Sequence, residues 1–203
     1  MKLYEFKRAP NPRRVRVFLK EKGIEMPTEQ VDLFKGEHKT PEHLKRNPSG
    51  LVPTLQLDDG RHISESTAIC RSLEEIQPNP PLLGTDAFDK ANVEMWQRRV
   101  EMELFMPIAH CFRHTVEAVK PLEPQQVKEW GELNRGRATA AMRRLDKELA
   151  GRDFIAGPRY TIADITALCA IDFGKASGIA IPDDCANLKR WHQTVSQRPS
   201  AAA

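Results

Sequence analysis

A short proline-rich segment, QPNPPLLG at Gln77–Gly84, divides the chain into two parts with different patterns. Before this segment, short apolar runs bounded by turn residues predict strands that are separated by helices. From about Asp89 onward the apolar residues follow helical spacing, and no convincing strand is found. Clustered prolines interrupt both helices and strands, so the segment is the best linker candidate. We therefore predict domains at 1–77 and 89–203, joined by a linker at 78–88.

The first part predicts the element order β-α-β followed by β-β-α. Strands are expected at Lys2–Phe6, Glu29–Leu33, Leu51–Leu57 and Arg61–Ile63. The stretch FKGEHKTPEHLKRNPSG between the second and third strands is polar and irregular. Good N-cap residues open SESTAICRSLEEI, and its apolar residues recur at helical spacing. This half is expected to be an α/β layer.

The second part predicts an all-helical domain. Asn92–Val119 has the pattern of one long helix, bent at Pro107. Val127–Leu149 is a second helix, with an apolar stripe formed by Trp130, Leu133, Ala141, Leu145 and Leu149. In YTIADITALCAI, Thr161 and Asp164 have the spacing of a capping box at the start of a buried helix. A last helix carries Leu188, Trp191 and Val195.

The basic segment RAPNPRRVRV at Arg8–Val17 has two interpretations. It can be a patch for a nucleic-acid backbone, or a turn that leads into a helix. The formal net charge is only +3, with 29% charged residues of both signs, so the chain lacks a strong field for polyanions. Asn11 suits an N-cap and Pro12 the first helical position. We favour the turn, with Arg13, Arg14 and Arg16 mostly on the helix surface, and expect no nucleic-acid partner.

Several other classes of protein are disfavoured by composition. No apolar run approaches the roughly 20 residues that span a bilayer, and MKLYEFKR lacks a signal peptide's apolar core. The four cysteines are far apart and form no CxxC pair, so no zinc or disulfide framework is indicated. We expect a reduced, cytoplasmic protein without a metal or a membrane partner.

Pro53 is an unusual residue for a strand, because proline lacks the N–H that a central strand uses. Where pairing stops, the backbone of Val52 becomes free, and an extended peptide can add there as one more strand. The alternative is a plain edge-strand proline. Both interpretations remain open from this feature alone.

Two further features suit the ends of a small ligand. Ser66 opens a helix whose N-terminal N–H groups attract a carboxylate, and Glu65 beside it suits an amine. His38 and Lys39, in the polar loop, suit a second carboxylate. The alternatives are a simple helix cap and solvent-exposed side chains. Together with Val52, these features fit an α-amino acid end, an extended peptide middle and a carboxylate tail, which describes glutathione.

The sequence resembles the glutathione S-transferases of the bacterial, theta-like type over essentially its whole length. The resemblance rests on KGEHKTPEHLKRNPSGLVPTLQLDDG followed by ISESTAI, on the TIAD box, and on the ending NLKRWHQTVSQRPS. It implies a thioredoxin-like α/β N-terminal domain and an all-α C-terminal domain. It also implies a homodimer, glutathione as co-substrate, and a role in detoxification.

The resemblance also implies roles for individual residues. The Val52 backbone would pair with the cysteinyl part of glutathione, and Pro53 would be a cis proline. Glu65 and Ser66 would hold the γ-glutamyl end. His38 would meet the glycine carboxylate, with Lys39 as a helper, while Thr161 and Asp164 would be a folding element.

One departure concerns the catalytic position. Many theta-like members place a serine where this chain has Ala9, and related proteins have a Thr-Pro-Asn turn associated with disulfide reduction. A free thiol with a pKa near ~8.5 is mostly protonated at neutral pH. Asn11 can donate an N–H to the sulfur, and the helix N-terminus adds a positive dipole end. We therefore take Asn11 as the catalytic candidate, with pure capping as the alternative. A smaller departure is Leu51, where many members have Lys or Arg.

The second substrate is expected along the helix Asn92–Val119, at Met102, Phe105, Met106, Ala109 and Arg113. The alternative for the Met and Phe residues is ordinary core packing. The reaction expected is addition of the glutathione thiolate to an electrophile. Reduction of a disulfide or peroxide, and a non-catalytic glutathione-binding module, remain alternatives.

Overall fold

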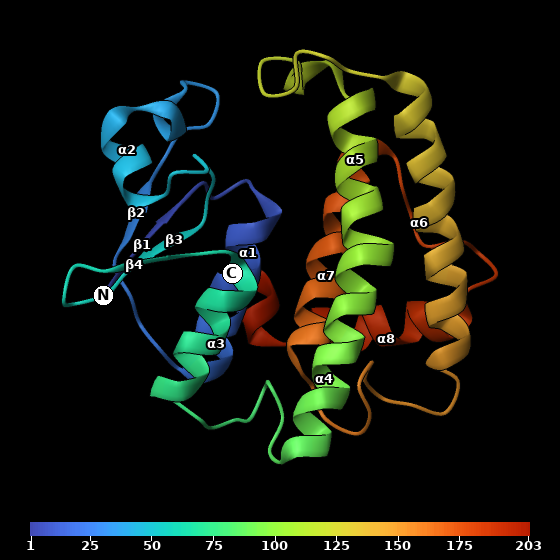
Figure 1. Ribbon diagram of the computed structural model, residues 1–203. Helices are drawn as coiled ribbons and strands as arrows, with labels where there is room; N and C mark the ends of the chain where they lie inside the picture. The colour runs from blue at the N-terminus through green and yellow to red at the C-terminus, as the bar shows by residue number, and fades with distance from the viewer. The chain divides into compact units, whose positions relative to one another are not determined.

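Four short strands form one mixed sheet in the order β2-β1-β3-β4, seen in a computed structural model that describes residues 1–203 (Figure 1). The strands are β1 (Lys2–Glu5), β2 (Thr28–Gln30), β3 (Thr54–Gln56) and β4 (His62–Ser64). β1 pairs parallel with β2 and antiparallel with β3, and β3 pairs antiparallel with β4. The sheet belongs to the first of two compact units, Met1–Pro80 and Pro81–Ala202. The boundary falls inside the segment expected as a linker.

Three helices and a short turn complete the N-terminal unit. They are α1 (Pro10–Lys22), the 3-10 turn η1 (Glu37–Lys39), α2 (Pro41–Arg46) and α3 (Ser66–Ile76). Figure 1 shows α1 and α3 side by side, and they are in contact. The sheet and these two helices enclose Leu3, Phe18, Leu55, Ile69 and Leu73, which have no solvent exposure. The expected α/β layer of thioredoxin-like type is confirmed.

The local predictions for this unit were partly wrong. The stretch expected to be irregular contains α2, which begins at Pro41 with Thr40 as its N-cap. The third strand begins at Thr54 rather than Leu51, so Val52 and Pro53 precede it. α1 begins at Pro10 with Ala9 as N-cap, so Asn11 is not the cap. Proline at the first helical position loses no intrahelical hydrogen bond, which permits this earlier start.

The arginines of α1 are not a surface patch. Arg14 is only 2% exposed, which contradicts the expectation that it lies on the helix surface. Arg16 is paired with Glu5 and donates to the Lys7 carbonyl at 2.9 Å. These guanidinium groups are therefore engaged inside the N-terminal unit.

The C-terminal unit is helical throughout. Its helices are α4 (Ala87–Val100), α5 (Met106–Thr115), α6 (Lys128–Glu148), α7 (Ile162–Gly174) and α8 (Ala186–Ser196). Short turns are η2 (Glu101–Phe105), η3 (Glu117–Val119), η4 (Lys175–Ser177) and η5 (Pro199–Ala202). In Figure 1, α4 and α5 form one nearly continuous rod beside α6, with α7 packed against the rod. α7 is buried along almost all of its length.

The long helix expected at Asn92–Val119 is divided by η2, whose π-helical hydrogen bonding ends at Phe105, two residues before Pro107. Proline cannot donate a backbone hydrogen bond, and a π-turn is one way for a helix to accommodate that loss. The stripe expected on α6 is buried at Ala141, Leu145 and Leu149 but not at Leu133, which is 51% exposed.

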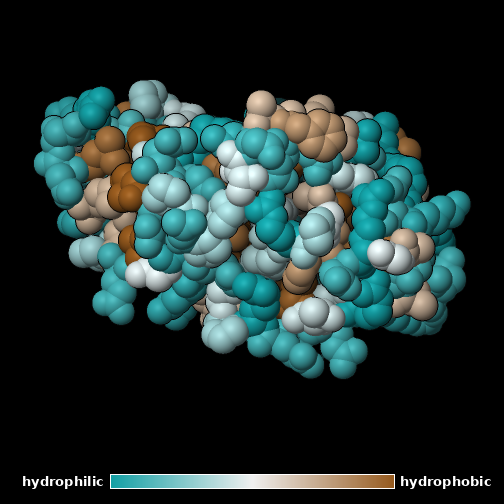
Figure 2. Space-filling view, turned by 90° about the horizontal axis from the view of Figure 1, so that it is seen from below, coloured by the Kyte–Doolittle hydropathy of each residue, from teal (hydrophilic) through white to brown (hydrophobic).

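Figure 2 shows one face of the molecule, on which hydrophilic residues predominate and hydrophobic residues appear in separate groups. No helix has the length and apolar character needed to cross a membrane. The cysteines Cys70, Cys111, Cys169 and Cys185 are all buried free thiols.

Candidate active site

The strand register brings the expected glutathione-binding segments of the N-terminal unit to one edge of the sheet, namely the edge at which β1, β2 and β4 end and β3 begins. Tyr4, near the end of β1, lies opposite Thr54 at the start of β3, and Thr54 lies opposite Ser64 at the end of β4. The chain after β1 leads to Asn11, the chain before β3 contains Val52, and the chain after β4 contains Ser66. β2 is parallel to β1, so the loop towards His38 leaves from the same edge.

Val52 has a fixed side chain and an unpaired backbone. Its side chain packs in a small cluster with Tyr4 and Val31, against Phe6 and Leu33. β3 pairing begins only at Thr54, and neither the N–H nor the C=O of Val52 takes part in a backbone hydrogen bond. The Val52–Pro53 peptide bond is cis. These two backbone groups can therefore pair with an extended peptide.

The carbonyl before Val52 is held by two side chains that the sequence analysis missed. His43 Nε2 lies 3.0 Å from the Leu51 oxygen, and Asn47 Nδ2 donates to the same oxygen at 2.9 Å. Both donors belong to α2 or its C-cap, and both are buried. The only available signal was the NPSG turn, because α2 itself was not recognised.

Glu65 and Ser66 form an N-terminus that has no internal cap. Glu65 has φ 66° and ψ 118° and is the only non-glycine residue with positive φ. Such a backbone costs on the order of 1–3 kcal/mol and tends to occur at functional sites. No side chain caps α3, and its first turn carries no acidic residue. The helix end is thus available to a carboxylate, with the exposed Glu65 beside it.

His38 and Lys39 lie against the turn that precedes Val52. A Cβ on Gly50 would lie 3.0 Å from both the His38 carbonyl and Lys39 Nζ, so glycine permits this close approach. Gly50 also has φ 61°, which a side chain rarely adopts. Burial lowers the pKa of His38, and the charges of Lys39 and His43 add to this effect. The imidazole is therefore neutral at pH 7 and can donate one N–H.

Asn11 occupies the second position of α1, and its Oδ1 accepts a hydrogen bond from Arg14 Nη1 at 3.2 Å. Ala9 caps the helix with backbone alone and supplies no hydroxyl. Tyr4 does not replace it, because its buried hydroxyl donates to Gln56 Oε1 at 2.9 Å. Asn11 is the remaining polar candidate at this helix end.

The five residues expected to receive a second substrate do not line one common hollow. Met102 and Met106 line a hollow of about 390 Å³ together with His110, Trp130 and residues of α6. Phe105 is only 4% exposed, Ala109 is half-buried and Arg113 is exposed. Burial lowers the pKa of His110, and Arg113 contributes to this shift. Sequence reasoning did not identify His110 or Trp130.

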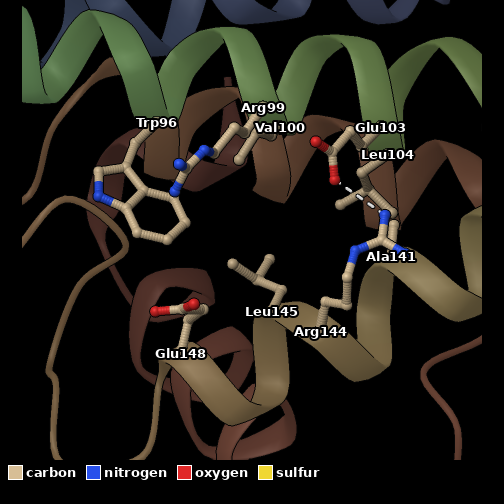
Figure 3. Close-up of a pocket in the computed structure, with 9 residues that line it drawn as sticks. All are labelled: Trp96, Arg99, Val100, Glu103, Leu104, Ala141, Arg144, Leu145 and Glu148. Carbon is tan, nitrogen blue, oxygen red and sulfur yellow. Dashed lines mark hydrogen bonds and ion pairs between the residues drawn. The ribbon is translucent and has the colours of Figure 1, made fainter.

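A second hollow of about 380 Å³ lies between α4 and α6 (Figure 3). Its lining alternates charged and apolar groups, and Glu103 accepts a hydrogen bond from Arg144 at 2.8 Å. The Arg99 guanidinium lies 4.9 Å from the Trp96 ring centre. The charged side chains that line this hollow are Arg99, Glu103, Arg144 and Glu148, and no reaction is assigned to it.

Thr161 and Asp164 are fully engaged in the C-terminal unit. Asp164 has no solvent exposure and accepts from Ile155 N, Thr161 N and Trp191 Nε1 at 2.9–3.0 Å. Burial raises the pKa of Asp164 to about 6, although these hydrogen bonds lower it. This geometry supports a folding role for the pair.

Comparison with known proteins gives one consistent match. Residues 9–76 match the family model for the glutathione S-transferase N-terminal domain, and residues 104–199 match that for the C-terminal domain. Glutathione S-transferase 2 of Saccharomyces cerevisiae is 36% identical over 203 residues, which cover 98% of this chain and 87% of that protein.

Solved structures agree with this match. Gtt2 from Saccharomyces cerevisiae superposes with a TM-score of 0.95 at 36% identity, covering 100% of this chain and 99% of that chain. A glutathione S-transferase domain-containing protein from Marinobacter aquaeolei has a TM-score of 0.95 at 35% identity, covering 98% and 99%.

Proposed function

The chain belongs to the glutathione S-transferase family, and we propose that it binds glutathione along the sheet edge of its N-terminal unit. It is a glutathione transferase, as Glutathione S-transferase 2 of Saccharomyces cerevisiae is named. The observation that carries the binding proposal is the register Tyr4–Thr54–Ser64, which collects the segments at one edge.

Each part of glutathione has a counterpart at this edge. The Val52 backbone pairs with the cysteinyl residue, next to Pro53. Ser66 and the α3 N-terminus hold the γ-glutamyl carboxylate, and Glu65 holds its amine. His38 and Lys39 receive the glycine carboxylate. A hydrogen bond to a charged group contributes about 1.5–3 kcal/mol, so the two ends anchor the molecule strongly.

The thiol is activated without a protein base. Asn11 Nδ2 donates to the sulfur, and the α1 N-terminus adds roughly 0.3–1 kcal/mol of favourable field. An amide cannot accept the thiol proton, which leaves through water or the γ-glutamyl carboxylate. The bound thiolate then attacks an electrophile, forming a carbon–sulfur bond and releasing the leaving group with its electron pair.

A paired assay tests this function. The purified protein is given glutathione with an aromatic halide in one arm and with a mixed disulfide in the other. We expect conjugation, whereas turnover of the disulfide alone supports the reductase alternative. Absence of glutathione binding at millimolar concentration contradicts the proposed function in both forms.

The electrophile is proposed to contact α5 near Ala109 and Arg113. A bulky Ala109→Trp substitution is expected to raise KM for the aromatic halide while leaving the glutathione Kd within about twofold. Ala118→Trp, at an exposed position in η3, is the matched control. Equal effects of the two substitutions contradict this location.

We also propose that the protein is a homodimer in the cytoplasm. The four free thiols suit that reducing compartment. The apolar side chains of Met95, Met102, Met106, Trp130 and Leu133 are exposed on α4, η2, α5 and α6. Sedimentation of the wild-type protein is expected to give twice the monomer mass, and Met102→Glu is expected to weaken association. A wild-type monomer contradicts the proposal.

A further inference from the structure

A buried arginine connects the two helix N-termini of the N-terminal unit. Arg14 donates from Nη1 to Asn11 Oδ1 at 3.2 Å and from Nη2 to Thr67 Oγ1 at 3.0 Å. Asn11 belongs to the first turn of α1, and Thr67 follows Ser66 in the first turn of α3. One guanidinium therefore connects Asn11, the residue proposed to activate the thiol, with α3, the helix whose N-terminus is proposed to bind the γ-glutamyl end.

The bond to Arg14 determines which end of the Asn11 amide is free. A carboxamide has one acceptor oxygen and two donor hydrogens, whereas a guanidinium has donors only. Arg14 can therefore bind only the oxygen of Asn11. The amide group is left to donate from Nδ2, and a thiolate is an acceptor. With the opposite orientation, the amide oxygen would face the sulfur and oppose its negative charge.

The second bond keeps the guanidinium in place. Thr67 Oγ1 accepts from the other terminal nitrogen, so both arms of the Arg14 fork are engaged. Packing alone does not require a charge here, because the neighbouring buried positions Val15, Phe18 and Leu19 are apolar. A buried cation is costly unless its hydrogen bonds are made.

Charged residues of both signs lie along the two helices around Arg14. The first turns of α1 and α3 contain no acidic residue. Arg13 precedes Arg14, Glu65 is the N-cap of α3, and Glu74 farther along α3 is paired with Lys22.

We propose that Arg14 is a positioning residue, held by Thr67, that fixes Asn11 with its amide N–H directed at the glutathione sulfur. This inference rests on the proposed function, because it requires glutathione to occupy the sheet edge. It assigns a role to a side chain that does not itself reach the reacting atoms.

Thiolate absorbance of bound glutathione, followed against pH, tests the proposal. Arg14→Met is expected to raise the pKa of the bound thiol by about one unit, equivalent to about 1.4 kcal/mol. Its Kd for S-methylglutathione, which has no thiol to ionise, is expected to change less than about threefold. Arg16→Lys, in the same helix and paired with Glu5, is the matched control and keeps the wild-type thiol pKa.

A double-mutant cycle separates positioning from general destabilisation. If Arg14 acts through Asn11, then Asn11→Ala in the Arg14→Met background produces no further change in thiol pKa. Arg14→Lys retains the charge but not the two-armed fork, and it carries the same test if the Met variant fails to fold.

The outcomes are distinguishable. An unchanged thiol pKa in an Arg14 variant that still binds S-methylglutathione overturns the inference, as do fully additive effects of the two substitutions. Failure of the wild-type protein to bind S-methylglutathione contradicts the proposed function instead.

Discussion

The N-termini of α3 and α7 begin with similar residues but have opposite environments. α3 starts with Glu65 and Ser66, and α7 starts with Thr161 followed by Asp164, so each pairs a carboxylate with a hydroxyl. At α7 the carboxylate is buried and accepts hydrogen bonds from backbone and side-chain donors. At α3 no side chain caps the helix, and Glu65 is exposed with a strained backbone.

This difference shows how to separate a folding element from a binding site. Residue types alone do not separate them, because Ser, Thr, Asp and Glu serve both purposes at helix N-termini. The distinguishing property is hydrogen-bonding capacity that remains after folding. Asp164 meets its donors within the chain, whereas no side chain caps the α3 N-terminus, where we propose that a ligand carboxylate binds.

The largest expected effect is therefore on stability, at α7. Asp164→Ala leaves the Ile155 and Thr161 N–H groups and the Trp191 indole without their acceptor, and each buried donor costs about 1–3 kcal/mol. We expect a loss of roughly 3–5 kcal/mol in unfolding free energy, measured by urea denaturation.

Asp183→Ala provides the comparison for this change. The exposed Asp183 carboxylate lies 2.7 Å from Lys189 Nζ. An ion pair at the surface contributes about 0–1 kcal/mol. If Asp164→Ala and Asp183→Ala destabilise equally, the structural role of Asp164 is wrong.

Stability is also expected to depend on pH through Asp164. Burial raises the pKa of its carboxyl to about 6 from 3.8, so between these values the folded state holds a proton that the unfolded state has lost. The contribution is fully present below about pH 4 and is lost as pH rises through about 6, with a size on the order of 3 kcal/mol.

Asp164→Asn isolates this contribution, because the amide does not titrate. The difference in unfolding free energy, wild type minus variant, should decrease as the pH rises from about 4 to about 6. Parallel pH profiles for the two proteins would show that Asp164 has the same pKa in both states.

The sequence predicted the architecture better than it predicted the local details of the candidate site. The order of strands and helices along the chain, the change to an all-helical second half and the α7 capping box follow from local periodicity and spacing, which a single sequence contains. α2 was missed because its six residues are mostly polar and too short for periodicity. The burial of Arg14 was missed because a tertiary partner, Thr67, determines it.

The site residues show the same limit. Val52, Glu65 and Ser66 could be selected as candidates because they carry local signals: a proline, a helix start and a hydroxyl. His43 and Asn47 hold the carbonyl of Leu51 through contacts that only the folded chain reveals. Asn11 was assigned to the wrong helical position, because Ala9 gives no capping signal.

At α3 the comparison predicts a loss of binding with little loss of stability. Ser66→Ala removes a hydroxyl that we expect to donate to the γ-glutamyl carboxylate, a bond of about 1.5–3 kcal/mol. The Kd for S-methylglutathione, measured by titration calorimetry, should rise about 10- to 100-fold. Unfolding free energy should change by less than about 1 kcal/mol.

Ser72→Ala, in the same helix but away from its N-terminus, is the control and should leave the Kd unchanged. If Ser66→Ala lowers stability as much as Asp164→Ala while binding is retained, the distinction between the two helix ends fails.

The smallest effect concerns the other end of the ligand. Burial holds the pKa of His38 below its ordinary value, so the free protein has a neutral imidazole at pH 7. A bound carboxylate favours the protonated imidazole, so the pKa of His38 is higher in the complex than in the free protein. Affinity for S-methylglutathione should therefore rise as pH falls from about 7 towards 5.5, by about two- to fivefold.

Two controls assign this pH dependence to His38 and the glycine carboxylate. His38→Gln should remove it, whereas His62→Gln on β4 should keep it. An analogue with the glycine carboxylate converted to an amide should bind the wild-type protein without the rise at low pH. If the rise persists with this analogue, the proton is taken up elsewhere, and the position of the glycine end at His38 and Lys39 is wrong.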